Sequence, residues 1–354
     1  MDTEKISRFQ LAVLMMGFLF YIIINPTATA KQDGWVAYLI SWAGGFIVLA
    51  GYVYIARKYP GQTLVDILKK NFGRYIGSII SLLYIWYFIH LAAIVIRNFA
   101  EFIVITNYPE TPLGFVIVIM IVTIAYSVRN GLEVMGRTGE LFIPMIPVMV
   151  ILTSILLFNR FDINSFKPFF VRGFKPILTT SIRILSFSFA DLIVFLMIFP
   201  SLNRQKDLLK TSMLALAIMG AVLFIIILRD FFILGADMLA DTVFPFALVL
   251  RLLPGLFNLD PIVKVNILVG GMCKVSICIY AAARGLAQIF NLNQYKQFVL
   301  PISFFVVVLA ICLYGSTFEA IQWAIGNYFY YAFPFQFIFP TIIFIISLFR
   351  RKKV

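Results

Sequence analysis

Apolar runs of about 17–25 residues recur from one end of this sequence to the other. Each run is long enough, as a helix, to cross a hydrocarbon core of about 30 Å. The 354 residues are 62% hydrophobic and 13% charged, with a mean hydropathy of +0.98. Water-soluble domains of this size do not have such a composition. The sequence therefore predicts an all-α polytopic membrane protein, a single transmembrane domain that occupies 1–354.

The apolar runs predict about ten transmembrane helices. Their expected boundaries follow from where each run begins and ends. The spans are 9–30, 35–56, 78–106, 113–128, 141–158, 178–199, 211–234, 261–290, 298–314 and 332–349.

The basic residues are distributed unequally between the two sides that these spans define. With the N-terminus in the cytoplasm, seventeen of the 29 Lys and Arg fall in inside segments and six in outside segments. The positive-inside rule therefore predicts that both termini are cytoplasmic. The same placement accounts for the net charge of +13 without a nucleic-acid partner. The outside loop 159–177, with four basic residues, departs from the rule.

The N-terminal segment also resembles a cleavable signal peptide. Lys5 and Arg8 precede an apolar stretch, and the small residues at 28–30 imitate a cleavage site. Against this interpretation, Asp2 and Glu4 interrupt the basic region, and the apolar stretch is longer than a signal needs. We therefore expect the first run to be a transmembrane helix.

Ten spans divide into two sets of five, at about 9–158 and about 178–349. Because each set is odd in number, the second enters the membrane from the opposite side, which is an inverted repeat. The linkers 57–77 and 235–260 follow the second span of each set, and both contain a segment that fits an interfacial amphipathic helix. The sequence therefore predicts a five-plus-five inverted repeat.

The first helix of each repeat contains residues suited to a break in the backbone. Inverted-repeat transporters interrupt these helices so that free N–H and C=O groups face a ligand at mid-membrane depth. "YIIINPTATA" (21–30) contains a proline, and "SFSFAD" (186–191) contains small hydroxylated residues and an acid. A simple proline kink, and serines bonded back to their own helix, are the structural alternatives. The residues indicated as ligand contacts are Asn25, Pro26, Thr27, Ser186, Ser188 and Asp191.

Several stretches resemble the spore germination permeases, the B-type subunits of germinant receptors, which belong to the amino acid–polyamine–organocation superfamily. The resemblance extends from about residue 30 to the C-terminus, and "TPLG" and "GLEVMGR" are its most specific parts. "KQDGW" (31–35) also fits. The stretches are "YPGQTLVDILKKNFGRYIG", "RNFAEFIVITNYPETPLG", "VRNGLEVMGRTGELFIP" and "FADLIVFLMIFPSLN".

The resemblance implies a leucine-transporter-like fold with broken first and sixth helices, in the inner membrane of the bacterial spore. It also implies assembly with A-type and C-type receptor subunits and recognition of a small germinant, often an amino acid. The sequence departs from the family at the first break, where "FLFYIII" (18–24) lacks the usual glycine. Capture of a ligand carboxylate by free backbone amides there is accordingly in doubt.

Asp191 lies near the middle of an apolar run, where a carboxylate costs at least a few kcal/mol and needs a partner. In the fold implied by the resemblance, the first, third, sixth and eighth helices enclose the site. Lys274 lies near mid-depth on the eighth, so we expect it to bind Asp191 or carbonyls freed near Asn25. A role in ligand binding or coupling is one interpretation, and an ion pair that only fixes helix packing is the other.

Two further charges in the third span, Arg97 and Glu101, are spaced i and i+4 and are expected to neutralise each other in a structural or coupling role. His90 fits a buried polar residue of the core better than a residue that binds a ligand.

The sequence predicts no metal site and no cofactor, because the three cysteines lack metal-binding spacing and no carboxylate–histidine cluster occurs. The cysteines are Cys273, Cys278 and Cys312.

Two classes of function fit this sequence. No nucleotide-binding glycine-rich loop and no catalytic triad occurs in the sequence, so we do not expect an enzyme. The first class is a germinant-sensing receptor subunit in the lipid bilayer. The second is an autonomous secondary transporter of amino acids or related organic cations, which needs the same kind of broken-helix site.

Overall fold

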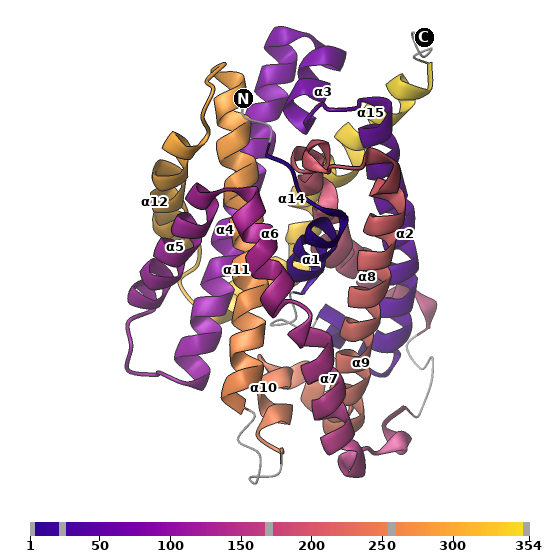
Figure 1. Cartoon of the computed structure of the whole chain (residues 1–354). Coiled ribbons are helices and arrows are strands. Elements are labelled where there is room, and N and C mark those ends of the chain that lie inside the picture. The colour runs from indigo at the N-terminus through magenta and orange to yellow at the C-terminus, as the bar shows by residue number, and fades with distance from the viewer. Residues whose placement is uncertain (1–3, 21–25, 167–172, 254–259, 350–354) are drawn as a thin grey trace.

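The computed structural model describes residues 4–20, 26–166, 173–253 and 260–349 (Figure 1). Within these ranges the chain is helical apart from its connections and one isolated bridge between Ile6 and Leu202. The helices up to the middle of the chain are α1 (Arg8–Leu19), η1 (Pro26–Asp33), α2 (Gly34–Lys58), α3 (Leu64–Phe72), α4 (Arg74–Thr106), α5 (Leu113–Asn130), α6 (Leu132–Phe142), α7 (Met145–Leu156), η2 (Phe158–Arg160) and η3 (Ile163–Phe166).

The second part of the chain is also helical, with more short 3₁₀ and π turns. Its elements are α8 (Phe174–Ile184), η4 (Leu185–Phe189), η5 (Ala190–Met197), η6 (Phe199–Ser201), η7 (Gln205–Asp207), α9 (Leu208–Asp241), α10 (Pro245–Leu250), α11 (Asp260–Ile289), α12 (Lys296–Cys312), α13 (Thr317–Gly326), α14 (Tyr328–Phe333), η8 (Pro334–Ile338) and α15 (Phe339–Phe349).

The long helices confirm an all-α polytopic membrane protein. Eight helices in the described residues are long and apolar enough to cross a membrane, and a ninth span results if α12 and α13, bent by 102°, count as one. The expected first span, 9–30, is not one continuous helix. It contains the short apolar helix α1 and the 3₁₀ turns of η1, and residues 21–25 between them lie outside the described part.

The fifth and seventh spans extend furthest beyond their expected boundaries. The fifth begins at Leu132, not at 141, because α6 buries Leu132, Met135 and Gly139 and turns its charged residues outward. The expected spans left 129–140 as a connection. The seventh, α9, continues to Asp241 but changes direction at Gly235, where φ is +70°, close to the expected end at 234.

The expected interfacial helix in the linker 57–77 is present as α3. Thr63 caps it, since its hydroxyl accepts from the Asp66 amide while the Asp66 carboxylate accepts from the Thr63 amide. One face of α3 is buried and its last turn carries Lys69 and Lys70. The linker 235–260, which the sequence predicts to be its counterpart, contains the six-residue helix α10.

The interior of the bundle is built around α1, α4 and α11. Figure 1 shows α1 inside the bundle, where it packs against α6, α9 and α11. The helix α11 packs closely on α4 because Gly271 lies against the Phe99 ring, where any side chain would collide. Gly270 meets Phe20 at the end of α1 in the same way. These contacts place α1, α4 and α11 around a shared interior.

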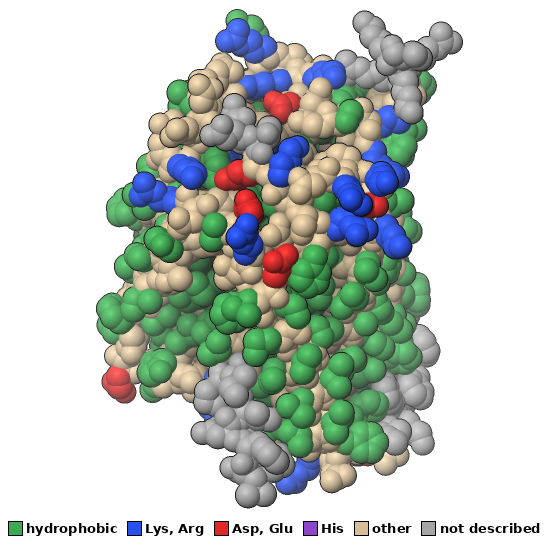
Figure 2. All heavy atoms as spheres, viewed as in Figure 1, with side chains coloured by type: hydrophobic (Ala, Val, Ile, Leu, Met, Phe, Trp, Pro, Cys, Tyr) green, Lys and Arg blue, Asp and Glu red, His purple; other side chains and the backbone are tan. Residues whose placement is uncertain are grey.

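The surface has a charged end and an apolar belt. On the face shown in Figure 2, Lys and Arg gather over the end of the molecule that carries α3, and hydrophobic side chains cover the region below it. Such a belt fits contact with lipid, with basic residues gathered at one interface.

Candidate functional site at the centre of the bundle

Asp191 lies fully buried in η5, the 3₁₀ segment of the sixth span. Its carboxylate accepts four hydrogen bonds from three other spans. Oδ2 accepts from Lys274 Nζ of α11 at 2.9 Å. Oδ1 accepts from Tyr87 of α4 at 2.6 Å, from Tyr328 of α14 at 2.6 Å and from Gln336 of η8 at 2.8 Å. A carboxylate is costly to bury in an apolar interior, and these four donors stabilise the negative charge of Asp191 there.

The backbone near Asp191 is not a regular α-helix. The sixth span passes from α8 into the π turn η4 and then into the 3₁₀ segment η5, so its hydrogen-bonding pattern changes twice just before and at the acid. The expected break at 186–191 is therefore a change of helix type, not an extended segment. Such π turns are frequent at functional sites.

A second π turn, η8 in the tenth span, faces the first. Gln336 of η8 joins them, since its Nε2 donates to the Ser186 carbonyl at 2.8 Å and its Oε1 accepts from the Ser186 hydroxyl at 2.6 Å. Tyr52 donates to the carbonyls of Ala190 and Gln336 at 3.1 and 2.8 Å. Backbone groups freed inside a membrane need such partners, so these side chains hold both irregular turns in place.

Aromatic rings cover the Lys274 ammonium. Its Nζ lies 4.8 Å from the ring centre of Phe18 in α1 and 5.9 Å from that of Phe187 in η4. Desolvated cation–π contacts of this kind stabilise a cation by about 2 kcal/mol or more. Lys274 thus connects α1, the sixth span and α11.

The structure brings together three of the residues indicated by the sequence, Asp191, Lys274 and Ser186. The Asp191–Lys274 pairing, which the sequence left open against carbonyls near Asn25, is present as a buried ion pair. For Ser188, which is half-buried, no side-chain hydrogen bond is found among the described residues. The remaining three belong to the first break. Pro26 begins η1, Thr27 is buried within it, and Asn25 lies outside the described residues.

Three members of the cluster, Tyr87, Tyr328 and Gln336, were missed by sequence reasoning. The tenth span was not expected to contribute to the site, yet it supplies two of them. The one available signal is Gln336, a lone amide in the apolar run "YYAFPFQFIFP" (330–340), since a polar side chain at such a place needs an internal partner. Tyrosines are too common in this sequence to stand out, with 16 in all.

Comparison with protein families places this chain. A family model described as "Spore germination protein" matches residues 5–320. The chain belongs to the spore germination protein family. It is 28% identical to spore germination protein KB of Bacillus subtilis, covering 100% of this chain and 97% of that protein. Its identity to spore germination protein YndE of Bacillus subtilis is 23%, over 82% of each.

Transporters are among the solved structures similar to this spore germination protein. MhsT in complex with L-phenylalanine superposes with a TM-score of 0.71 at 12% identity, over 98% of this chain and 89% of MhsT. Mhp1, a nucleobase-cation-symport-1 family transporter with bromovinylhydantoin bound, gives 0.69 at 12% identity, over 97% and 78%. At this identity the likeness concerns the fold, which is the leucine-transporter-like fold.

A second buried ion pair in this spore germination protein joins Arg97 and Glu101, whose Nε and Oε1 lie 2.6 Å apart on α4. The Arg97 guanidinium also donates to the carbonyls of Ala310, Ile311 and Tyr314, where α12 ends and the chain bends toward α13. The last carbonyls of a helix have no partner within it. The pair therefore holds the end of α12 against α4, which favours the structural interpretation.

A third cluster surrounds Glu4 at the end of the bundle where the chain begins. Its carboxylate accepts from Tyr280 at 3.1 Å, Tyr295 at 2.8 Å and the backbone amide of Leu132 at 3.2 Å. Burial and the nearby Glu4 carboxylate raise the pKa of Tyr295, so its hydroxyl stays protonated as a donor. A cavity of about 440 Å³ opens beside this cluster, with Arg284 in its wall.

Proposed function

We propose that this protein is the germinant-sensing integral membrane subunit of a spore germination receptor. In this proposal a small germinant, such as an amino acid, binds at mid-membrane depth beside Asp191. Binding shifts an equilibrium between conformations of the bundle, which partner subunits detect or which opens an ion path. The protein acts without a cofactor and is not an enzyme, in keeping with a family and a fold of permease and transporter type.

The single observation that carries this proposal is the convergence of four spans on one carboxylate. Tyr87, Lys274 and Gln336 come from three different spans, and each donates to Asp191 of the sixth. A ligand that exchanges any of these hydrogen bonds for its own alters contacts between spans directly. Helix packing alone does not require so many donors on one acid.

We propose that the ligand contacts residues of the two interrupted helices and the lysine that pairs with Asp191. In the sixth and eighth spans these are Ser186, Ser188, Asp191 and Lys274. In the first break they are Asn25, Pro26 and Thr27. Phe18 and Phe187, which cover the lysine, supply apolar contact area to the same site.

Replacement of the acid tests the proposal. Asp191→Ala in the full-length protein should abolish the germination response, measured as the loss of spore optical density after exposure to a mixture of amino acids, sugars and nucleosides. The protein should still accumulate in the membrane. Asp241→Ala, at an exposed position on α9, is the matched control and should respond normally. An unchanged response of Asp191→Ala would remove the acid from the site, and loss of the protein itself would favour a purely structural role.

A second candidate function is autonomous secondary transport of an amino acid or related organic cation. The fold shared with MhsT and Mhp1 favours it. The purified protein in liposomes should then accumulate a radiolabelled substrate against its gradient. The receptor proposal expects no accumulation without partner subunits.

We further propose that the protein lies in the inner membrane of the spore with both termini in the cytoplasm, next to A-type and C-type receptor subunits. The gathering of basic residues at one end of the molecule supports this orientation (Figure 2). Cysteines introduced at 57–77 should react with a membrane-impermeant reagent from the cytoplasmic face, and cysteines at 159–177 from the opposite face. Labelling of 159–177 from the cytoplasm would contradict the orientation.

A further inference from the structure

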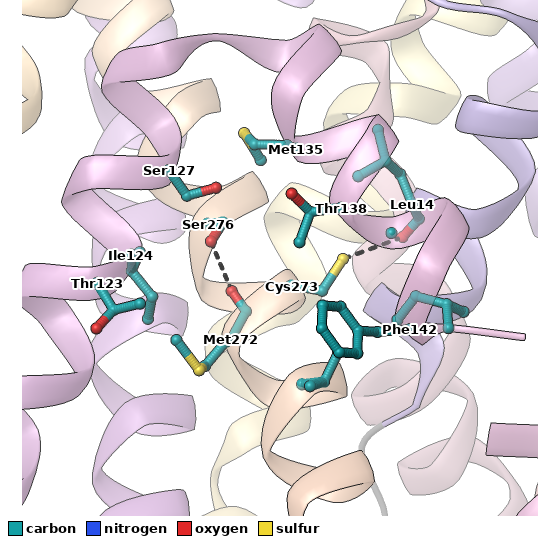
Figure 3. A pocket seen from close by; sticks show the side chains of 13 residues that line it. Leu14, Thr123, Ile124, Ser127, Met135, Thr138, Phe142, Met272, Cys273 and Ser276 are labelled. Carbon is teal, nitrogen blue, oxygen red and sulfur yellow. Dashed lines mark hydrogen bonds between the residues drawn. The ribbon is translucent and has the colours of Figure 1, made fainter. Parts of the chain in front are cut away.

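A cavity of about 250 Å³ lies apart from the Asp191 cluster, between α1, α5, α6 and α11 (Figure 3). For comparison, an apolar cavity of about 150 Å³ in another protein holds benzene. By the same ratio, the space is large enough for a molecule of about ten non-hydrogen atoms. Leu14 of α1 and Cys273 of α11 form one side of it, so an occupant would touch the residue that precedes Lys274.

The walls exclude charged ligands. The side chains that line the cavity are apolar or carry a hydroxyl or thiol, and none is a Lys, Arg, His, Asp or Glu. An ion or a zwitterion placed there would lose its hydration with no opposite charge to replace it. A free amino acid, the kind of ligand proposed for the Asp191 site, is therefore a poor fit here.

Most of the polar groups in these walls already have partners. The hydroxyls of Thr123 and Ser276 donate to carbonyls of their own helices, at 3.1 and 2.7 Å. The Cys273 thiol is directed to the Leu14 carbonyl at 3.8 Å. These three groups add little polarity to the cavity.

Two hydroxyls remain available. In Figure 3 the side chains of Ser127 on α5 and Thr138 on α6 point toward one another across the cavity. Neither hydroxyl has a hydrogen-bond partner in the described part of the protein, and the cavity is open to the surface on this side, because Thr138 is exposed and Ser127 is half-buried. The surrounding Ile124, Met135 and Met272 are apolar. The arrangement is a polar pair at one place in an otherwise apolar space, which suits a molecule with a single hydroxyl on a short hydrocarbon body.

We propose that this cavity binds a small neutral alcohol, aliphatic or phenolic, whose hydroxyl bonds to Ser127 and Thr138. The alcohol donates to one of these hydroxyls and accepts from the other, which satisfies both. Its hydrocarbon part replaces empty space next to Met135 and Met272 with apolar contact. The site is separate from the germinant site and needs no charge.

Photolabelling of the purified full-length protein in lipid nanodiscs tests the proposal. The probe is a hexanol that carries a diazirine, and mass spectrometry locates the modified residues. Labels should concentrate in 123–143 and 269–276. The double variant Ser127→Ala with Thr138→Val loses two hydrogen bonds and should lower labelling there about tenfold. Thr123→Val is the matched control, because its hydroxyl lines the same cavity but already has a partner, and it should label normally.

Competition with unlabelled molecules shows whether the cavity prefers an alcohol to a hydrocarbon. An excess of 1-hexanol should block labelling, whereas hexane should not. Three results would overturn the proposal: labels spread evenly over the lipid-facing surface, equal labelling of the double variant, or equal displacement by hexane. The last would mean that the cavity holds hydrocarbon alone, as a lipid acyl chain would supply.

Discussion

Asp191 with Lys274 and Arg97 with Glu101 are both buried ion pairs, but they connect different parts of the bundle. The side chains of Asp191 and Lys274 are 0% and 2% exposed, and those of Arg97 and Glu101 are 7% and 6% exposed. Arg97 and Glu101 belong to one helix, and the cation extends the pair to the end of α12. Asp191 and Lys274 belong to different spans, and the anion gathers further donors from two more.

A pair that supports the fold and a pair that can respond to a ligand differ in how many other partners their charged groups have. Arg97 donates to carbonyls that accept no other hydrogen bond from the described residues, so any change of its position leaves them without that partner. Asp191 has several neutral donors besides Lys274, so single contacts can be exchanged while the carboxylate remains bonded. A site that must change on ligand binding needs this redundancy, and a helix end does not.

The largest loss of stability should come from Arg97→Met. The change leaves Glu101 buried without its cation and removes the donors at the end of α12, which should cost about 3–5 kcal/mol. Thermal unfolding of the purified protein in detergent measures it. Arg137→Met is the matched control, because it breaks an exposed i, i+4 pair with Glu133 and should cost less than about 0.5 kcal/mol. Equal stability of the two variants would contradict a supporting role for Arg97.

Lys274→Met should destabilise less, by about 1–3 kcal/mol, because Tyr87, Tyr328 and Gln336 still donate to Asp191. The germination response should nevertheless be lost, since the only cation bonded to this carboxylate among the described residues is gone. Lys210→Met, at an exposed position on α9, is the control and should respond normally. A normal response of Lys274→Met would show that the lysine serves packing alone.

Adding Asp191→Asn to Lys274→Met tests whether the two charges stabilise each other. Because the acid no longer carries an unmatched charge, the double variant should recover part of the stability lost by Lys274→Met. A double-mutant cycle from the four unfolding curves gives the coupling energy. Strictly additive losses would mean that the two side chains do not stabilise each other, despite the 2.9 Å that separates Nζ from Oδ2.

The smallest expected effect is that of sodium. We propose that Lys274 supplies permanently, between the first, sixth and eighth spans, the positive charge that a bound cation would otherwise provide. Replacing sodium by choline should therefore leave the germination response and the thermal stability unchanged. A response that requires sodium would overturn this role of the lysine.

Sequence reasoning reached the acid and the cation of the central cluster but not its neutral members. A charge within an apolar run is conspicuous, because its burial is costly whatever the fold. Tyr87 and Tyr328 carry no such signal, since a tyrosine in a membrane helix can equally face lipid, packing or an interface. The start of the fifth span was wrong for a related reason: α6 has its charges on an exposed face, which composition alone does not separate from a loop.

By itself, the sequence determined the class of molecule, because hydrocarbon accepts only long apolar helices whose backbone is satisfied internally. It also determined that Asp191, Lys274, Arg97 and Glu101 need partners, since that requirement depends on charge and depth alone. The tertiary structure decided which partners they have. The π turns η4 and η8 meet only when the sixth and tenth spans are packed together, and no local propensity records a contact across 150 residues. Their meeting brings Gln336 and two tyrosines to Asp191, because freed carbonyls and a buried charge in one low-dielectric space must share the same few donors.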